Sequence, residues 1–466
     1  WPLQCCALTL RRISAMPLPT DKSSMPKNFD AWSLSHIAAA LMSARFWSVS
    51  VMVTPFVCSK NIALDVACGQ SFGMNFLLTD LPNDFHANPY PIYALLREQA
   101  PVHPQPDGSF IISRHADLDM IYRDTTRFIS DKKKVFKPKY GASPLFEHHT
   151  TSLVFNDAPL HTRVRSIMIG AMNPRAIASM EDGLIRQVDW LLDQMSEQVD
   201  LIKSFAGAIP LEVIGNLFNM PHEERGPLQD WSLAILGALE PALSQQQLDD
   251  GNRAVSEFKA YLKDLVVRRA KNPGDPQTDV LTRMMQSEKG QLSEVELLQN
   301  CIFILNAGHE TTTNLIGNAL ALLDADPDSK AELIANPGLL NTAVDEFLRM
   351  ESPNQFGNRL TTEDTTLHGT HIPEGTDLHL CIGAANRDAD HFETPNALKL
   401  DRRPNKHLAF AGGAHTCVGL SLARMEGRIA VGRFLDRFPK YVLMEGAERG
   451  NRIRFRGYAR LPAKLS

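Results

Sequence analysis

The chain has 466 residues, of which 44% are hydrophobic and 22% charged, and its formal net charge is -5 at pH 7. This length allows one large core or several small domains, and neither the composition nor the charge indicates nucleic acid as a partner. Of the seven cysteines, four precede Gln70 and the other three stand far apart. This spacing indicates neither a disulfide framework nor a C-x-x-C metal site, and it favours a reducing compartment.

Residues 1–73 are rich in Ser, Met, Trp and Cys and lack a sustained periodicity, whereas helix and turn signals begin at Met74. We therefore expect an N-terminal extension over 1–73, disordered or not native, followed by a single folded domain over 74–466. The apolar stretch 36–58 is interrupted by Arg45 and Pro55, whereas a membrane helix needs about 20 consecutive apolar residues. We expect no membrane anchor, and a location in the cytoplasm.

From Asp84 the pattern is mostly helical, with short extended segments. A hairpin is predicted around Gly108, between a run ending at His103 and a run over 109–113. The polar segment 131–152, with three successive lysines, predicts a long loop that is either a functional lid or a plain surface loop. No dinucleotide fingerprint and no Walker loop is found. The predicted helices in this part cover 88–99, 116–123, 175–198, 210–219 and 251–270.

A long apolar helix is predicted over 294–325, because Ser293 and Glu296 form a capping box and Pro327 follows the end. A helix that is apolar nearly all round is buried. Its middle, AGHETTT at 307–313, contains poor helix formers whose hydroxyls can bond preceding carbonyls and bend the helix. Such a place marks either a functional site or a buried polar contact with a neighbouring helix. The acid beside an alcohol, Glu310-Thr311, is typical of a proton-delivery pair.

The segment FAGGAHTCVG at 410–419 precedes another predicted helix over 420–438. Cys417 lies just before the helix N-terminus, where amide groups favour a thiolate, and the glycines allow close approach of the backbone. A thiolate here is a nucleophile, a zinc ligand or a haem ligand; a buried structural cysteine is the remaining alternative. Zinc needs more ligands, and only His415 is near, whereas a haem thiolate needs one protein ligand.

This loop resembles the haem-binding loop of the cytochrome P450 family, soluble bacterial type, with the pattern F-x-x-G-x-H-x-C-x-G. Many bacterial members have Gly and an aromatic residue where this chain has Ala411 and Gly412, which changes the rigidity of the loop but not the ligand. The residues that match the pattern are Phe410, Gly413, His415, Cys417 and Gly419.

Further segments resemble family motifs in the family's order, from about Asp84 to the C-terminus. The segment 307–312, which includes Ala307 and Gly308, resembles the oxygen-activation motif of the central helix. Glu346 and Arg349 resemble the structural E-x-x-R pair; a plain surface ion pair is the alternative. The segment 386–388 resembles the meander. Positions that contact the haem propionates are matched by His161, Arg165, Arg359 and His415, for which ordinary surface residues are the alternative.

The resemblance implies a mainly α fold with small β-sheets, in which haem b lies between the long central helix and the cysteine loop. Cys417 would be the iron ligand, and Glu310 and Thr311 would deliver protons. The implied activity is a monooxygenase that inserts one atom of dioxygen into a small organic substrate. Electrons would come from a separate ferredoxin or flavodoxin with its reductase. The alternative is a non-catalytic thiolate-haem binding or sensing protein.

Two sets of residues are candidates for contacts with partners. Four arginines on the last helix form either a basic docking patch for the redox partner or a solvated helix face: Arg424, Arg428, Arg433 and Arg437. Leu305, Asn306, Ala307 and residues 353–356 are candidates to face the substrate. Asn306 would bond either a polar group of the substrate or a neighbouring backbone group.

Overall fold

The computed structural model describes residues 75–286 and 292–466, which belong to one compact unit. The expectations for residues 1–73, including the apolar stretch 36–58, lie outside the described residues. Within the two described ranges, no helix combines the length and the apolar character that crossing a membrane requires.

Helices dominate the described unit, as predicted. They are α3 (Tyr90–Gln99), α4 (His115–Arg123), α5 (Lys133–Tyr140), α6 (Pro144–Thr151), α7 (Leu160–Ala171), α8 (Pro174–Asp193), α9 (Ala208–Leu217), α10 (Leu228–Gly237), α11 (Gln245–Lys271), α12 (Val280–Met285), α13 (Glu294–Ala325), α14 (Pro327–Ala335), α15 (Leu340–Met350), α16 (Ile382–Ala385) and α17 (Leu420–Arg437). The helix predicted over 175–198 is too long, because α8 ends at Asp193 and strand β4 (Gln198–Asp200) follows.

The prediction of a structureless loop over 131–152 is wrong. This segment forms α5 and α6, and the side chain of Ser143 caps α6 by accepting a hydrogen bond from the Phe146 amide. Apolar side chains spaced along the segment, such as Phe136 and Leu145, are buried in the core and stabilise both helices. Lys132, the first of the three lysines, is fully buried and forms an ion pair with Asp377.

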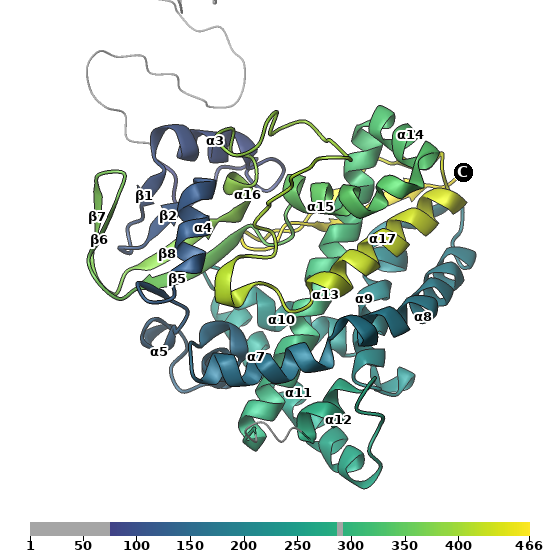
Figure 1. Cartoon of the computed structure of the whole chain (residues 1–466), viewed down its shortest axis with the longest axis horizontal. Helices are drawn as coiled ribbons and strands as arrows, with labels where there is room; N and C mark the ends of the chain where they lie inside the picture. Colours follow the sequence, from purple (N-terminus) through teal and green to yellow (C-terminus); the bar gives the residue numbers. More distant parts are fainter. Residues whose placement is uncertain (1–74, 287–291) are drawn as a thin grey trace, which may run out of the picture. The chain divides into compact units, whose positions relative to one another are not determined.

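The β-structure is small, and its largest sheet lies beside α3 and α4 (Figure 1). The largest sheet has the strand order β1 (Val102–Pro104), β2 (Phe110–Ile112), β8 (Asp377–Cys381), β5 (Phe356–Thr361) and β3 (Phe128–Ile129). Strands β1 and β2 pair antiparallel, which confirms the predicted hairpin. The smaller sheets contain β4, β12 (Pro462–Lys464) and β9 (Val442–Leu443); β6 (Thr365–Leu367) and β7 (Thr370–Ile372); and β10 (Glu448–Arg449) and β11 (Tyr458–Arg460).

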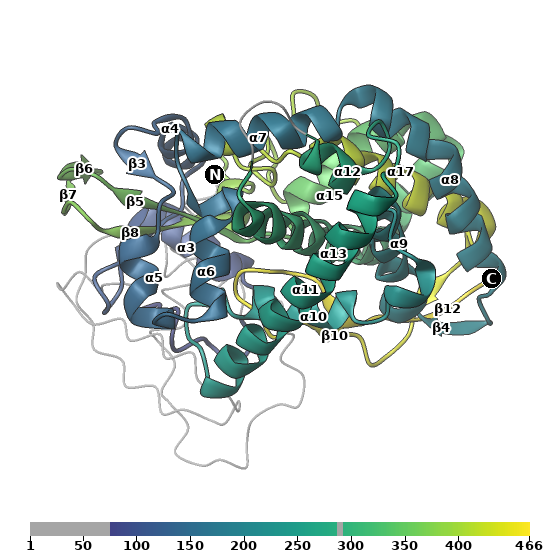
Figure 2. The ribbon, with the colours of Figure 1, turned by 90° about the horizontal axis from the view of Figure 1, so that it is seen from below.

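Helix α13 passes through the middle of the helical region and contacts α9, α10 and α17 (Figures 1 and 2). The predicted capping box is present, and the helix has the predicted bounds. The hydroxyls of Thr311 and Thr313 donate to the carbonyls of Ala307 and His309, at 2.7 and 2.9 Å, as the sequence indicates. The hydrogen-bonding pattern nevertheless stays α-helical from end to end.

The four arginines of α17 are all in ion pairs. Arg424 contacts Asp345 of α15 at 2.8 Å. The other three contact carboxylates of α8, with each shortest N···O distance at 2.6 Å: Arg428 with Glu181, Arg433 with Asp189 and Arg437 with Asp193. These contacts neutralise the arginines locally and join α17 to its neighbours, which favours a helix-joining role over a free basic patch.

Candidate active site

One face of α13 borders accessible space. Between positions 297 and 321 every residue is buried except Phe303, Ala307, Gly308 and Thr311. Phe303, Ala307 and Thr311 are four residues apart, so their side chains lie on one face of the helix. Leu305, which the sequence offered as a candidate to face the substrate, is 3% exposed and packs in the core. Phe303, which the sequence did not single out, contributes the large apolar side chain there.

The cysteine loop contains the short turn Gly413–His415 before Cys417, and α17 begins three residues after Cys417. Cys417 is partly exposed, and the adjacent Val418 packs in the same apolar cluster as Phe303. Burial raises the pKa of the Cys417 thiol, against the opposing effects of the Gly419 amide and the charges of Arg165 and Arg424. The groups that were predicted to favour a thiolate are therefore present. In the protein alone, however, burial raises the pKa of Cys417 by more than these groups lower it.

Two glycines let the cysteine loop approach α4 closely. Gly413 has φ +64°, and a Cβ atom at this position would overlap the carbonyl oxygen of Tyr122. A Cβ atom at Gly412 would lie 3.2 Å from the Cβ of Tyr122. A side chain at position 412 would therefore require Tyr122 to shift by a few tenths of an ångström. The glycine at position 412, where the chain departs from the family pattern, thus lies in a close contact between the cysteine loop and α4.

The four residues predicted to contact propionates lie together. The ring centroids of His161 and His415 are 3.9 Å apart, and Arg165 donates to the carbonyl of Thr416 at 2.6 Å. The Arg359 guanidinium lies 5.0 Å from the ring centroid of Tyr122. In the described part of the chain, His161 Nε2 and Arg359 Nε and Nη2 are buried without a hydrogen-bond partner. The Arg359 atoms are N–H donors, and His161 Nε2 donates in one tautomer of the ring, so an anionic group would satisfy this set.

Asp157 is a member of this cluster that the sequence did not single out. Its carboxylate accepts hydrogen bonds from the amides of Ser130 and Asp131, at 3.0 and 2.9 Å, and lies 3.8 Å from His415 Nε2. Ser130 Oγ is 3.1 Å from the same nitrogen. Burial lowers the pKa of His415, while Asp157 opposes that effect. The Ser130 hydroxyl therefore orients the His415 ring, with the Asp157 carboxylate close by.

Glu310 is held by Arg452, which lies between β10 and β11. Arg452 Nη1 donates to both carboxylate oxygens of Glu310, at 2.8 and 2.7 Å, and its Nη2 donates to the Leu233 carbonyl of α10 at 2.8 Å. Burial raises the pKa of Glu310 to about 7, against the opposing charge of Arg452. No local pattern points to Arg452, which is 142 residues away in the sequence.

The Glu346–Arg349 pair is not at the surface. Both side chains are fully buried, and Arg349 Nε lies 2.8 Å from Glu346 Oε2. Arg402 joins Glu346 at 3.0 Å, and Arg349 also donates to the carbonyls of Asn386 and Pro395. Burial opposes the charge of Glu346, but hydrogen bonds from Arg349 hold the pKa of this carboxyl below its ordinary value. The pair thus anchors the segment that leads to the cysteine loop.

Comparison with known proteins agrees with this geometry. The cytochrome P450 family model matches residues 102–449. The chain belongs to the cytochrome P450 family. It is 34% identical over 372 residues to a biotin biosynthesis cytochrome P450 of Bacillus subtilis (strain 168), covering 78% of this chain and 92% of the relative. It is also 34% identical over 390 residues to a vitamin D(3) 25-hydroxylase of Pseudonocardia autotrophica, covering 82% and 94%.

A crystal structure of P450BioI in complex with hexadec-9Z-enoic acid ligated acyl carrier protein has a similar fold, with a TM-score of 0.78 and 32% identity over 82% of this chain and 100% of that chain. As a cytochrome P450, this chain is a haem-thiolate monooxygenase that oxidises an organic substrate with dioxygen and takes electrons from redox partners. Its residues fit the cofactor. The unsatisfied donors of His161 and Arg359 suit haem carboxylates, and the open face of α13 suits a flat apolar group.

The buried ion pairs around Glu346 yield a stability prediction. Glu346→Ala leaves Arg349 and Arg402 buried without their carboxylate, so we expect the free energy of unfolding to fall by about 3–5 kcal/mol. As a control, Asp189→Ala removes the partly exposed pair with Arg433 and should cost at most about 1 kcal/mol. Urea unfolding measures both losses, and equal losses would contradict the prediction.

Proposed function

We propose that Cys417 Sγ would bind the iron of haem b. The observation that carries this proposal is that the anion-binding cluster lies against the cysteine loop, because Arg165 donates to the carbonyl of Thr416, next to Cys417, at 2.6 Å. In this proposal Ala307 and Gly308 lie against the cofactor, and Phe410 and Gly419 shape the loop around the sulfur. His161, Arg165, Arg359 and His415 bind and orient the haem carboxylates.

When bound, the haem supplies the activation of dioxygen that thiolate ligation favours. Glu310 holds the proton needed for this reaction on its carboxyl group, and its raised pKa of about 7 keeps a protonated fraction near neutral pH. Thr311 Oγ1, now donating to the Ala307 carbonyl, passes that proton on after rotating towards the open face. This acid–alcohol pair favours turnover over the alternative of a non-catalytic haem sensor.

We further propose that the electrons come from a separate ferredoxin or flavodoxin with its reductase, and that the protein works in the cytoplasm. The free thiols Cys301, Cys381 and Cys417 agree with a reducing compartment.

The ligand assignment is tested by the ferrous carbon monoxide complex. We expect the haem-loaded protein to give the far-red-shifted Soret band of thiolate ligation and Cys417→Ala to lose it. Cys301→Ala is the matched control, because this buried cysteine of α13 is distant in sequence from the loop, and it should keep the band. A folded, haem-loaded Cys417→Ala protein that retained the band would refute the assignment.

Proton delivery predicts a pH dependence. The Glu310 carboxyl is protonated below about pH 7 and ionised above it, so product formed per electron pair should fall as the pH rises through this value. Glu310→Gln should remove the inflection, and Thr311→Ala should lower the yield by about tenfold or more while retaining the carbon monoxide band. Thr313→Ala is the control, since its hydroxyl makes the same bond to a carbonyl. A normal yield in Thr311→Ala would count against the relay.

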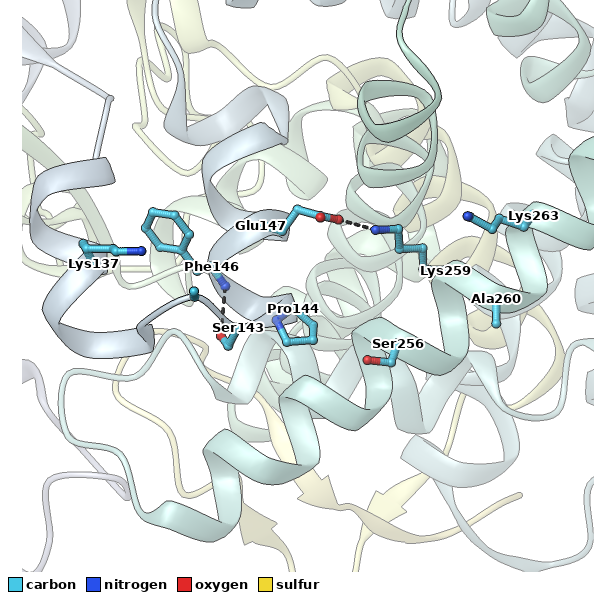
Figure 3. Close-up of a pocket in the computed structure, with 10 residues that line it drawn as sticks. Lys137, Ser143, Pro144, Phe146, Glu147, Ser256, Lys259, Ala260 and Lys263 are labelled. Atoms are coloured by element: carbon cyan, nitrogen blue, oxygen red, sulfur yellow. Dashed lines mark hydrogen bonds and ion pairs between the residues drawn. The ribbon is translucent and has the colours of Figure 1, made fainter.

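The resemblance to P450BioI supports a second proposal, that the substrate arrives as an acyl group on a carrier protein. A groove of about 620 Å³ lies between α6 and α11 (Figure 3). Its lining includes three lysines, Lys137, Lys259 and Lys263, and one carboxylate, Glu147. Lys259 is paired with Glu147, whose Oε1 also accepts from Gln299 of α13 at 2.6 Å. Lys263 is paired with Glu294 at 3.1 Å, so the remaining positive charge of the lining is that of Lys137, which suits an acidic group on a partner surface.

Charge reversal in the groove tests this proposal. We expect the double variant Lys137→Glu/Lys263→Glu to bind an acyl carrier protein loaded with hexadec-9Z-enoic acid several-fold more weakly than the unchanged enzyme, with a reduced dependence on salt. Lys271→Glu lies at the end of α11, outside the groove lining, and should bind normally. Fluorescence anisotropy of the labelled carrier protein gives the affinities. Equal affinities for the unchanged enzyme and the double variant would reject the groove.

A further inference from the structure

Three buried polar atoms that have no partner among the described residues belong to the lining of one small cavity. The cavity has a volume of about 10 Å³, and its lining comes from α3 and the residues before it, from Gln355 and from the segment 450–457. The three atoms are Tyr93 Oη, Gln355 Oε1 and His86 Nδ1, and Tyr93 and Gln355 are 0% and 1% exposed. Because buried polar groups are nearly always paired, three unpaired atoms in one lining indicate a shared ligand.

The size and the hydrogen-bonding groups of the cavity fit one water molecule. A volume of about 10 Å³ is enough for a single water and too small for a second. A water molecule accepts a hydrogen bond from the Tyr93 hydroxyl and donates to Gln355 Oε1 and His86 Nδ1. This gives the three hydrogen bonds that a buried water typically makes.

A charged ligand is disfavoured by the two arginines of the lining. The guanidinium of Arg452 is paired with Glu310 at 2.7 Å, and that of Arg456 is paired with Glu351 at 2.6 Å. Both guanidinium groups repel a cation. Because each of them is already neutralised locally, an anion would lack a counter-charge here. The cavity therefore suits a neutral ligand.

The Tyr93 hydroxyl differs from another buried tyrosine hydroxyl of the protein. Burial, and to a smaller extent the nearby Cys381 thiol, raises the pKa of Tyr93. The pair nevertheless lies outside hydrogen-bond geometry, and a thiol is a weak partner. The hydroxyl of Tyr441, by contrast, donates directly to the Leu320 carbonyl at 2.6 Å. Tyr441 is thus satisfied by the protein, whereas Tyr93 is left for a ligand.

The segment 450–457, which forms one wall of the cavity, also contacts α13. Arg452 donates to both carboxylate oxygens of Glu310, at 2.8 and 2.7 Å. A Cβ atom at Gly457 would overlap Asn314 Oδ1, so the backbone of the segment packs directly against the helix one turn after Glu310. The segment therefore determines where the charge of Arg452 stands relative to the acid.

Residues elsewhere in the lining hold this segment. The backbone amide of Gln355 donates to the Arg454 carbonyl at 2.7 Å. Burial lowers the pKa of His86, while a hydrogen bond to the Arg452 backbone opposes this effect. The uncharged imidazole then has one ring nitrogen that accepts. A ligand shared by Tyr93, Gln355 and His86 therefore joins α3 to the segment.

We propose that the cavity binds one water molecule that joins its three unpaired atoms and fixes the segment 450–457. The segment in turn keeps Arg452 on Glu310, so Tyr93 is a positioning residue for the acid. It acts through the water and the segment and does not touch the reacting groups. The water site stands on the cavity alone, whereas the positioning role rests on the proposed proton delivery by Glu310.

Thermal unfolding tests the water site through the sign of its result. Tyr93→Phe removes only the hydroxyl. If this hydroxyl binds a water, its loss should lower Tm by about 2 °C, whereas removal of an unpaired hydroxyl should leave Tm unchanged or raise it. Tyr441→Phe is the matched control and should lower Tm, because its hydroxyl bonds a carbonyl. An unchanged or raised Tm in Tyr93→Phe would overturn the inference.

A crystal structure of the haem-loaded protein provides an independent check of the site. We expect an ordered water within hydrogen-bond distance of Tyr93 Oη and Gln355 Oε1. A crystal that shows ordered waters in the interior elsewhere but none in this cavity would also overturn the inference.

The positioning role is measured by the pH dependence of product formed per electron pair. Burial raises the pKa of Glu310 to about 7, against the charge of Arg452, so a less fixed segment should move the inflection to higher pH. We expect a shift of about 0.3–1 pH unit in Tyr93→Phe, a larger one in Arg452→Gln and none in Tyr441→Phe. An unmoved inflection in Tyr93→Phe would refute the role. Failure of the proposed proton delivery is distinguishable, because the unchanged enzyme would then show no inflection while the Tm and crystal results would stand.

Discussion

A buried polar atom without a partner costs roughly 1–3 kcal/mol, and the distribution of such atoms governs the organisation of this protein. Deep ion pairs elsewhere are fully compensated. Glu346 is bound by Arg349 and Arg402, and Glu351 is bound by Arg456 at 2.6 Å. Around the open face, by contrast, the donors of Arg359 and the amide of Asn306 are left unsatisfied. The unpaired donors of Arg359 are the ones that haem carboxylates would satisfy.

Helix α13 meets two opposing demands. It must be buried on most sides to hold α9, α10 and α17 together, and it must leave one face accessible. Gly308 serves the first demand, because a Cβ atom there would lie 2.9 Å from Ile214 Cδ1 of α9. Phe303, Ala307 and Thr311 serve the second. The helix tolerates its poor helix formers because the hydroxyls of Thr311 and Thr313 bond carbonyls within the same helix.

Local signals in the sequence were sufficient to predict much of this fold and of the candidate site. The capping box of Ser293 and Glu296 predicted the start of α13, and glycines on either side of Cys417 predicted a tight loop before α17. The prediction of a loop over 131–152 was wrong because the segment is mostly polar. Its apolar residues Phe136 and Leu145 stabilise helices by packing against distant parts of the core, which the local sequence does not show.

The residues that the sequence did not single out act across long separations. Tyr122, Asp157, Arg402 and Arg452 come from four different parts of the chain, and no spacing rule connects them to their partners. Tyr122 contacts both the cysteine loop and Arg359, so it sets the distance between the sulfur and the anion-binding cluster. Such contacts follow from how elements pack together, and a local pattern of residue types does not contain that information.

The segment around Arg452 connects the acid of the active site to the wall formed by α10. Besides pairing with Glu310, Arg452 donates to the Leu233 carbonyl. Glu240, just beyond α10, accepts from the Ile453 amide at 2.8 Å, and Arg454 Nε donates to the Leu239 carbonyl at 2.7 Å. Helix α10 therefore cannot move away from α13 without straining the contacts that hold Glu310. Since burial and Arg452 together set the pKa of Glu310, the position of α10 and the protonation of Glu310 are physically coupled.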